Sequence, residues 1–506
     1  MHSTRPNILY LMCDQFRYDC IRALGNTGIH TPNLDRLVRR GVTFERAYST
    51  CPVCIPARWT LRTGRETWNT GCYANEPPAP MDGLPQDMND RCGAYLAQVL
   101  RDAGYYTFGY GKFHAHPYFK PELGYDDHKV CEELWETPER RAQDSYAAWL
   151  KTEHPEYNHL EQPHGDRTNM YYTPQTSALP ADCVVEGYLA DRTVEKLAQL
   201  PAGDPWFGFV SFLGPHPPCA PPVPFNRMYD PDKLPNPIKG DPDVDHMDEQ
   251  IPWMNRIIWA DELNDFAARN FRSRYYGEIT YIDGCIGRIL DAVEARPDAD
   301  NTLICFFADH GEHLGDHHAW QKESWFEASC HIPFLVSWPA RIAPGHTDAL
   351  ACLTDLFGVA TAAAGIPTLR DGEDLLGALD GSAAPRETLT AVYGRPGTPL
   401  FKMMLRTGDW KYIYMANGRR EQLFCTGKDP QELHLCNAEQ PELLAQLRAQ
   451  TAAFCERPGL YAALEDTAAG RTLRGFDYTE RPRPRIHQFD HSSGITDFGP
   501  APEELE

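Results

Sequence analysis

The sequence lacks an apolar run long enough to cross a membrane and lacks a surplus of basic residues. Its first apolar segment, residues 7–13, is too short for a span, and no small-residue cleavage site follows it. The 506 residues include 48 Lys and Arg against 71 Asp and Glu, a formal charge of −23. Because nucleic-acid binding requires a basic face, we expect no nucleic-acid partner. Because we see neither a membrane span nor a signal segment, we expect a cytoplasmic protein without a membrane partner.

The sixteen cysteines lack the paired spacing of a zinc site. Cys51 and Cys54 form a Cys-x-x-Cys pair, but no second cysteine or histidine pair accompanies it. We expect free thiols rather than a disulfide framework, since no signal segment is visible. The pair also fits a thioredoxin-like redox motif, although that motif normally lies in a small βαβ domain.

Buried strands and amphipathic helices alternate along the first three quarters of the chain. Apolar runs of strand length occur at residues 7–13, 206–212, 302–307 and 333–338. Apolar residues at helical spacing occur at 183–200, 271–295 and 354–364. This alternation predicts an α/β fold with a large, mixed, mostly parallel central sheet flanked by helices.

The pattern changes near residue 375, where several short strands follow one another. Thr407–Asp409 is typical of a tight hairpin turn, and a closing helix is expected at about 440–455. These features predict a smaller C-terminal α+β subdomain with an antiparallel sheet. We expect a catalytic α/β domain over 1–380, this subdomain over 381–480 and an extended tail over 481–506. We also expect residues 130–180, which are polar and aromatic-rich, to form an irregular insertion or lid.

The stretch from Cys51 to Arg65 resembles the start of a helix with a reactive group at its N-terminus. Pro56 suits the first turn of a helix, where its missing N–H costs nothing. Cys54 then lies at the helix N-terminus, whose free N–H groups and dipole favour an anion. Arg58 follows one turn later, so the stretch predicts a nucleophile beside an oxyanion site.

Polar residues follow two of the predicted strands. Asp14 and Gln15 come after residues 7–13, and Asp309 and His310 come after residues 302–307. Ligands of open α/β sheets gather at the carboxyl ends of strands, and carboxylate and amide oxygens suit a hard cation. These four residues therefore predict a metal site, although Asp14 taken alone fits a simple turn cap equally well.

Basic and imidazole groups follow the other strands. Lys112 and His114 end a strand near 105–111, His216 lies in a proline-rich loop after 206–212, and Lys322 follows the acidic segment at 309–318. Each alone fits a solvated or structural loop. Their convergence at strand ends favours cations for an anionic group and acid–base catalysts.

In this order the motifs resemble those of the type I sulfatases of the alkaline-phosphatase-like superfamily. The resemblance extends from residue 7 to about residue 450. It rests on Cys54-x-Pro56-x-Arg58 with Leu61-Arg-Thr-Gly-Arg65, Gly111-Lys-Phe-His114, Pro215-His216-Pro217, Asp309-His-Gly-Glu312, Trp320-x-Lys322 and Arg406-Thr-Gly-Asp-Trp-Lys411-Tyr412.

The resemblance implies that Cys54 is oxidised by a maturation enzyme to formylglycine, whose hydrate attacks a sulfate ester. It implies one divalent cation. Calcium is the expected ion, and magnesium or manganese are the alternatives. The implied metal ligands are Asp14, Gln15, Cys54, Asp309 and His310. The implied catalytic residues are Cys54, Arg58, Lys112, His114, His216 and Lys322, with His216 protonating the leaving alcohol and His114 taking a proton from the second hydroxyl.

Three positions depart from the common family pattern. Gln15 and His310 occupy positions where many members have Asp and Asn, and Ala57 replaces a more usual Ser. The expected reaction is hydrolysis of a small sulfate monoester, such as a sulfated carbohydrate. Two alternatives remain open: a phosphonate monoester hydrolase or phosphodiesterase of the same superfamily, and a non-catalytic anion-binding protein with unmodified Cys54. A homo-oligomer is also left open.

Overall fold

The protein is described by a computed structural model, which covers residues 5–75, 88–115, 123–132, 138–157, 160, 163–165, 171–468 and 470–481. Its centre is an eight-stranded sheet in the order β4-β3-β5-β1-β6-β7-β2-β8. The strands are β1 (Asn7–Cys13), β2 (Val42–Tyr48), β3 (Tyr106–Gly111), β4 (Asp127–Val130), β5 (Trp206–Phe212), β6 (Thr302–Ala308), β7 (Phe334–Ser337) and β8 (Gly345–Cys352).

Strand β1 lies at the middle of this sheet and is buried along its whole length. It pairs in parallel with β5 and β6, so that Leu11 faces Val210 on one side and Phe306 on the other. Of the eight strands, β7 alone runs against its neighbours β6 and β2. Central parallel strands are apolar on both faces because helices cover them. The predicted mixed, mostly parallel sheet is confirmed.

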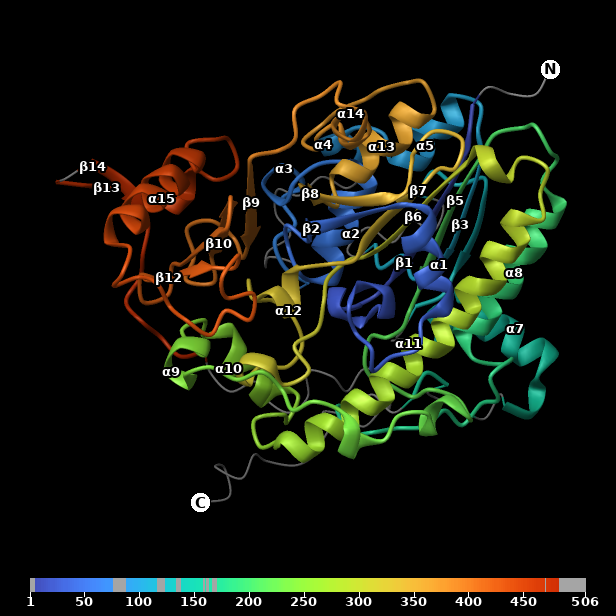
Figure 1. The fold of residues 1–506 in the computed structure, drawn as a ribbon, viewed down its shortest axis with the longest axis horizontal. Helices are drawn as coiled ribbons and strands as arrows, with labels where there is room; N and C mark the ends of the chain where they lie inside the picture. The colour runs from blue at the N-terminus through green and yellow to red at the C-terminus, as the bar shows by residue number, and fades with distance from the viewer. Residues whose placement is uncertain are drawn as a thin grey trace.

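Two groups of helices enclose the sheet (Figure 1). One group contains α1 (Pro32–Arg40), α8 (Val185–Gln199) and α11 (Asp265–Glu294), with α11 packed against both others. The other group contains α2 (Cys54–Thr63), α5 (Leu96–Asp102) and α13 (Asp355–Ala363). The remaining helices of the described chain outside its C-terminal unit are short: α3 (Thr67–Thr70), α4 (Met88–Cys92), α6 (Pro138–Gln143), α7 (Ser145–Glu153), α9 (Pro242–Asp245), α10 (Gln250–Ile257), α12 (Glu327–Cys330) and α14 (Leu375–Asp380).

A second, smaller unit follows and lies to one side of the central sheet (Figure 1). Its sheet is antiparallel, in the order β12-β11-β10-β9. The elements are β9 (Thr388–Tyr393), β10 (Lys402–Thr407), β11 (Trp410–Met415), β12 (Arg420–Cys425), α15 (Pro441–Phe454), β13 (Leu464–Thr467) and β14 (Gly470–Leu473). Thr407 pairs with Trp410 across the predicted hairpin turn. The C-terminal antiparallel sheet is therefore confirmed.

Some segments differ from the sequence expectation. Residues 145–153, expected to be irregular, form α7, whose N-cap Asp144 accepts a hydrogen bond from the amide of Ala147 at 2.9 Å. Strand β8 and helix α10 were not predicted, because β8 begins with polar, partly exposed residues and α10 follows a proline-rich loop. Much of the predicted insertion, and the predicted tail beyond residue 481, lie outside the described residues.

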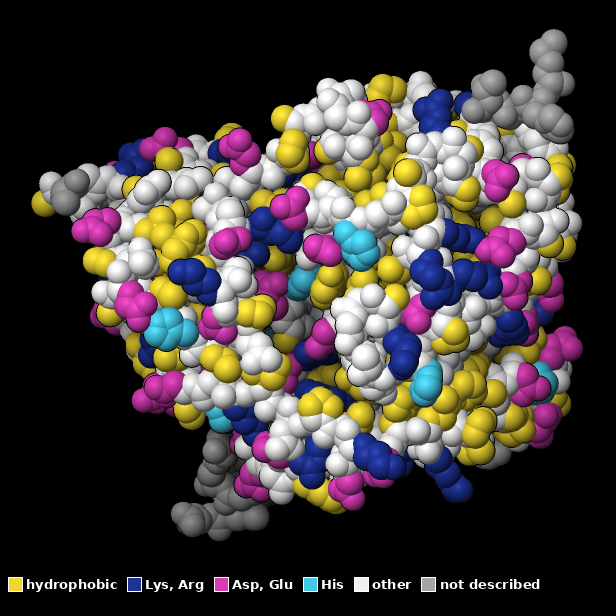
Figure 2. Space-filling view, in the orientation of Figure 1, with side chains coloured by type: hydrophobic (Ala, Val, Ile, Leu, Met, Phe, Trp, Pro, Cys, Tyr) yellow, Lys and Arg dark blue, Asp and Glu magenta, His cyan; other side chains and the backbone are white. Residues whose placement is uncertain are grey.

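The surface carries no broad basic area on the face shown in Figure 2, where Lys and Arg side chains are interspersed with Asp and Glu. Within the described ranges, no helix has the length and apolarity needed to cross a bilayer.

Candidate active site

Four adjacent parallel strands deliver their following residues to one edge of the sheet. The strands are β3, β5, β1 and β6, in that spatial order. Lys112 follows β3, His216 lies in the loop after β5, Asp14 follows β1 and Asp309 follows β6. The carboxyl ends of parallel strands lie on the same side of a sheet, which explains why residues about three hundred positions apart meet here.

Cys54 is the first residue of α2, as the sequence predicts. Val53 is the N-cap, and the whole helix is buried. The Cys54 sulfur lies 3.1 Å from Nε2 of His310 and 3.8 Å from Oδ1 of Asp14. The position expected to hold the nucleophile therefore points into the group of metal-ligand candidates.

Arg58 lies one turn further along α2 and links the two aspartates. Its Nη2 is 2.7 Å from Oδ2 of Asp14, and its Nε is 2.9 Å from Oδ2 of Asp309. Lys112 adds a second cation, with its Nζ 2.6 Å from the same oxygen of Asp14. All four side chains are completely buried. Burial alone would raise the pKa of Asp14, but Lys112 and Arg58 hold it well below its ordinary value.

The backbone before Lys112 requires a glycine. Gly111 has a φ of 105°, and a Cβ there would lie 1.9 Å from the carbonyl oxygen of Ser211. Because β3 approaches β5 so closely, the amide of Lys112 donates to that carbonyl at 3.0 Å. The hydroxyl of Ser211 accepts from Nη1 of Arg58 at 3.0 Å. Gly111 and Ser211 thus help to fix the positions of Lys112 and Arg58.

Lys322 joins the two sides of the site. Its Nζ donates to Oε1 of Gln15 at 2.7 Å and lies 3.2 Å from Nε2 of His216. Gln15 has a φ of 61°, and its backbone amide donates to Oδ1 of Asp309 at 3.0 Å. His216 is oriented by its own loop, since its Nδ1 lies 2.6 Å from the carbonyl oxygen of Pro217.

His114 is held through its backbone rather than through the metal-ligand group. Its φ is 47°, and its amide donates to Oε1 of Glu132 at 2.8 Å. The side chain is half-buried. The structure thus brings Asp14, Gln15, Cys54, Arg58, Lys112, His216, Asp309, His310 and Lys322 into one contact network, whereas His114 adjoins that network through the loop after β3.

The four side chains Asp14, Cys54, Asp309 and His310 fit a divalent cation. Their candidate donor atoms all lie within 4.8 Å of one another, and all four are buried. Burial lowers the pKa of His310, so its imidazole is neutral at neutral pH, which is the form that coordinates a metal. Two carboxylates with one imidazole form a suitable donor set for a hard or borderline cation. Gln15 can contribute its amide oxygen beside them.

The geometry argues against a redox role for Cys51 and Cys54. Burial, with the charge of Asp14, raises the pKa of the Cys54 thiol to about 12. Burial also raises the pKa of Cys51 well above its ordinary value. Such thiols are protonated at neutral pH and are poor nucleophiles, unlike the thiolates of redox motifs. All sixteen cysteines are free and buried, as expected.

Sequence reasoning assigned no role to Glu312, Ser211 or Tyr172. Glu312 accepts hydrogen bonds from the side chains of Gln15 and Tyr172, and it is completely buried. Two of these residues had a signal in the sequence. Glu312 is the acidic residue that ends the motif at 309–312, and Ser211 is a polar residue inside the apolar strand at 206–212. Tyr172 had no local signal, because its partners are more than a hundred residues away.

Comparisons with known proteins identify the family of the chain. The model of the family described as Sulfatase matches residues 6–366. The chain is 28% identical to a choline-sulfatase of Rhizobium meliloti over 498 residues, covering 93% of this chain and 91% of the relative. It is 27% identical to an arylsulfatase of Clostridium perfringens, covering 86% and 91%.

Among solved structures, a phosphonate monoester hydrolase of Agrobacterium radiobacter superposes with a TM-score of 0.75 at 25% identity, covering 93% of this chain and all of that chain. The fold and the matched length together lead to one conclusion: the chain belongs to the sulfatase family of hydrolases.

Proposed function

We propose that the protein hydrolyses the sulfate monoester of a small molecule to an alcohol and inorganic sulfate, with residue 54 as the nucleophile after conversion to formylglycine. The observation that supports this most is the position of Cys54. Its sulfur points at His310 and Asp14, while Arg58, Lys112 and Lys322 place three cations in the same network. An unmodified thiol with a pKa of about 12 would be a poor nucleophile here.

The cations would bind and orient the sulfate group. Arg58 and Lys112 are already pre-organised by Asp14, so they can stabilise charge on the sulfate oxygens without reorganising. Asp14, Gln15, Asp309 and His310 would hold a divalent cation, which supplies electrophilic polarisation and lowers the pKa of a bound hydroxyl. Calcium is our first choice, because most of these ligands are oxygens.

The remaining residues would move protons. A hydroxyl of the hydrated aldehyde at position 54 gives its proton to Asp309 and attacks sulfur, and the bond from sulfur to the alcohol oxygen breaks. His216, beside Lys322, gives the leaving oxygen its proton. His114 then takes the proton of the second hydroxyl, the carbon–oxygen bond to sulfate breaks, and the aldehyde re-forms and is hydrated again by water. A sulfate ester of serine or cysteine has no second hydroxyl on the same carbon, so it could not release sulfate by this route.

The test is turnover by protein produced with and without a formylglycine-generating enzyme. Mass spectrometry of the peptide containing residue 54 should show conversion of the thiol to an aldehyde. Hydrolysis of an aryl sulfate or of small sulfated saccharides should follow the fraction converted. Absence of sulfate ester hydrolysis by fully converted protein would refute the proposal, and a thiol that stays unconverted would favour the anion-binding alternative.

A second candidate activity is hydrolysis of phosphonate monoesters or phosphodiesters. It is favoured by the TM-score of 0.75 to a phosphonate monoester hydrolase. Comparison of kcat/KM for 4-nitrophenyl sulfate and a 4-nitrophenyl phosphonate monoester on the same converted protein decides between the two. A ratio in favour of the phosphonate would replace the first proposal.

A further inference from the structure

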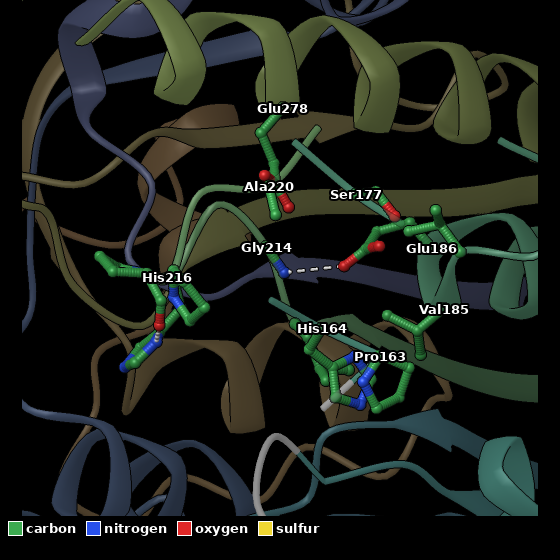
Figure 3. Close-up of a pocket in the computed structure, with 13 residues that line it drawn as sticks. Pro163, His164, Ser177, Val185, Glu186, Gly214, His216, Ala220 and Glu278 are labelled. Atoms are coloured by element: carbon green, nitrogen blue, oxygen red, sulfur yellow. Dashed lines mark hydrogen bonds between the residues drawn. The ribbon is translucent and has the colours of Figure 1, made fainter. Parts of the chain in front are cut away.

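Two buried acids contact the loop that carries His216. This loop, residues 213–220, follows β5. The amide of Gly214 donates to Oε1 of Glu186 on α8 at 3.1 Å, as Figure 3 shows. Glu278 on α11 packs against the same glycine and lines one cavity with Glu186 and Ala220. Carboxyl groups from two different helices therefore meet at the start of this loop.

The two acids and the loop are closely packed. A Cβ at position 214 would lie 2.9 Å from Oε1 of Glu278, so this carboxyl group packs directly against Gly214. In Figure 3, Gly214 lies between Glu186 and Glu278, and the loop continues from it to His216. Because Nε2 of His216 is 3.2 Å from Nζ of Lys322, a small shift of this loop would change that distance.

Neither acid forms an ion pair with a Lys or Arg of the described residues. Glu186 is 2% exposed and Glu278 is 8% exposed, and Oε2 of Glu278 has no hydrogen-bond partner among the described residues. Burial raises the pKa of Glu186 to about 7. Burial, together with the charge of Glu186, raises the pKa of Glu278 well above its ordinary value. Both carboxyl groups therefore keep their protons to higher pH than solvent-exposed acids do.

The groups around the pair are almost all neutral. Both acids line a small cavity of about 30 Å³, whose described wall contains no Lys or Arg. The titratable groups facing the two acids are His164 and His216 at the cavity wall, the thiols of Cys13, Cys219 and Cys285, and the phenols of Tyr146 and Tyr281. Arg288 reaches Cys285 but forms its ion pair with Asp191.

We propose that Glu186 and Glu278 are positioning residues for His216, because Glu186 accepts from the amide of Gly214 and Glu278 packs against the same residue at the start of the loop 213–220. The inference rests on the proposed function, in which His216 protonates the leaving alcohol. Loss of the last proton places two negative charges against one short loop in a buried cavity. The loop then moves, and His216 leaves its position beside Lys322.

Turnover tests the acceptor role. In Glu186→Ala the amide of Gly214 loses its acceptor, and kcat should fall at least about tenfold while KM changes little, since misplacement of a catalytic group chiefly affects the chemical step. Glu186→Gln keeps a carbonyl acceptor and should restore kcat at neutral pH. Glu278→Gln is permanently neutral, so the alkaline limb of its kcat profile should move to higher pH. Glu195→Gln, on the exposed side of α8, is the matched control.

Hydrogen exchange of the peptide covering residues 206–222 tests the loop without turnover. Exchange should be faster in Glu186→Ala than in the wild type and unchanged in Glu186→Gln. If wild-type protein with the aldehyde shows no turnover, the proposed function fails. Hydrogen exchange still shows whether Glu186 positions the loop. Wild-type exchange in Glu186→Ala would overturn the inference. So would a Gln variant as impaired as the Ala variant, or a Glu278→Gln profile identical to the wild type.

Discussion

Two groups of largely buried charges in this molecule look alike but differ in composition and position. The group proposed to be catalytic, here called the catalytic cluster, contains Asp14, Arg58, Lys112, Asp309 and Cys54 at the carboxyl ends of parallel strands. The second group, here called the junction triad, contains Glu327, Lys411 and Glu432 and joins the C-terminal sheet to the segment after β6. Lys411 is completely buried, and its Nζ lies 2.5 Å from Glu327 and 2.6 Å from Glu432.

The difference lies in what each group leaves available for a ligand. In the junction triad, Nζ of Lys411 also donates to the carbonyl oxygen of Trp325 at 2.7 Å, so this cation already has three close oxygen neighbours. In the catalytic cluster, two cations meet Asp14, and His310 and Cys54 add ligand atoms of another kind. Buried ion pairs are therefore poor markers of function. Mixed ligand types at strand ends are better ones.

The largest expected effect follows from Cys54→Ala. Removing the group that forms the nucleophile should lower kcat/KM for an aryl sulfate by about 10⁴-fold or more. The midpoint of thermal unfolding should change little, because a thiol is small and no ion pair is broken. Activity and unfolding are measured on the same preparation.

Cys51→Ala is the matched control for this variant. Cys51 is equally buried, but its sulfur faces the carbonyl oxygen of Tyr73 and not the cluster. It should retain wild-type turnover. An equal loss of activity in both variants would contradict the assignment of Cys54 as the nucleophile and would favour a joint redox role of Cys51 and Cys54.

The comparison between the clusters is tested most directly by removing one lysine from each. In Lys411→Met, Glu327 and Glu432 lose their shared cation, and the free energy of unfolding should fall by about 3–5 kcal/mol. The turnover of the protein that remains folded should be near wild type. Urea unfolding and turnover per folded molecule provide the two readings.

Lys112→Met should show the opposite pattern. Asp14 still pairs with Arg58 at 2.7 Å, so the loss of stability should be smaller, while turnover should fall by at least about a hundredfold. Equal stability losses, with turnover preserved in Lys112→Met, would show that both groups are structural.

Metal removal should affect the catalytic cluster alone. A bound cation at a hundred times its Kd contributes about 2.7 kcal/mol to stability. Dialysis against a chelator should therefore lower the midpoint of thermal unfolding and abolish turnover, and added Ca²⁺ should restore both. Lys411→Met should keep this metal-dependent shift. Asp14→Asn should lose it, and a shift that persists in Asp14→Asn would place the cation elsewhere.

The catalytic cluster was predictable from the sequence because its residues carry local signals. Asp14 and Asp309 directly follow apolar strands, and Cys54 is followed by Pro56 at the spacing of a first helical turn. Once the strands are assigned, parallel pairing brings their ends together. The same reasoning predicted the mixed central sheet and the C-terminal hairpin.

The junction triad and the acids that hold the His216 loop were not predictable in this way. Lys411 belongs to a recognised motif, but its partner Glu327 lies in a short helix 84 residues earlier, where nothing marks it as the partner of a buried lysine. Glu186 and Glu278 look like ordinary polar positions of two amphipathic helices. Their burial depends on how α8 and α11 pack against the loop after β5, and such packing has no periodic signature.

The smallest expected effect concerns Glu66, a buried acid that is bonded to hydroxyls rather than to a cation. The hydroxyls of Thr50 and Thr354 donate to it at 2.6 and 3.0 Å. Burial raises its pKa to about 7. An acid whose pKa is raised by folding favours the folded state most below its unfolded pKa of about 4.3, and this contribution is lost as pH rises to about 7. The free energy of unfolding should fall over that interval.

Glu66→Gln should remove this slope, because the amide is neutral at every pH, and one hydroxyl can accept from its NH₂ group while the other still donates to its carbonyl oxygen. Relative to the wild type, the variant should gain about 1–2 kcal/mol between pH 5 and pH 8, measured by urea unfolding. Glu153→Gln, on an exposed position of α7, is the control and should show no such difference. A pH-independent difference for Glu66→Gln would mean that Glu66 is ionised in the folded protein. Buried acids without a bonded cation would then resemble Asp14 more closely than the comparison of the two clusters implies.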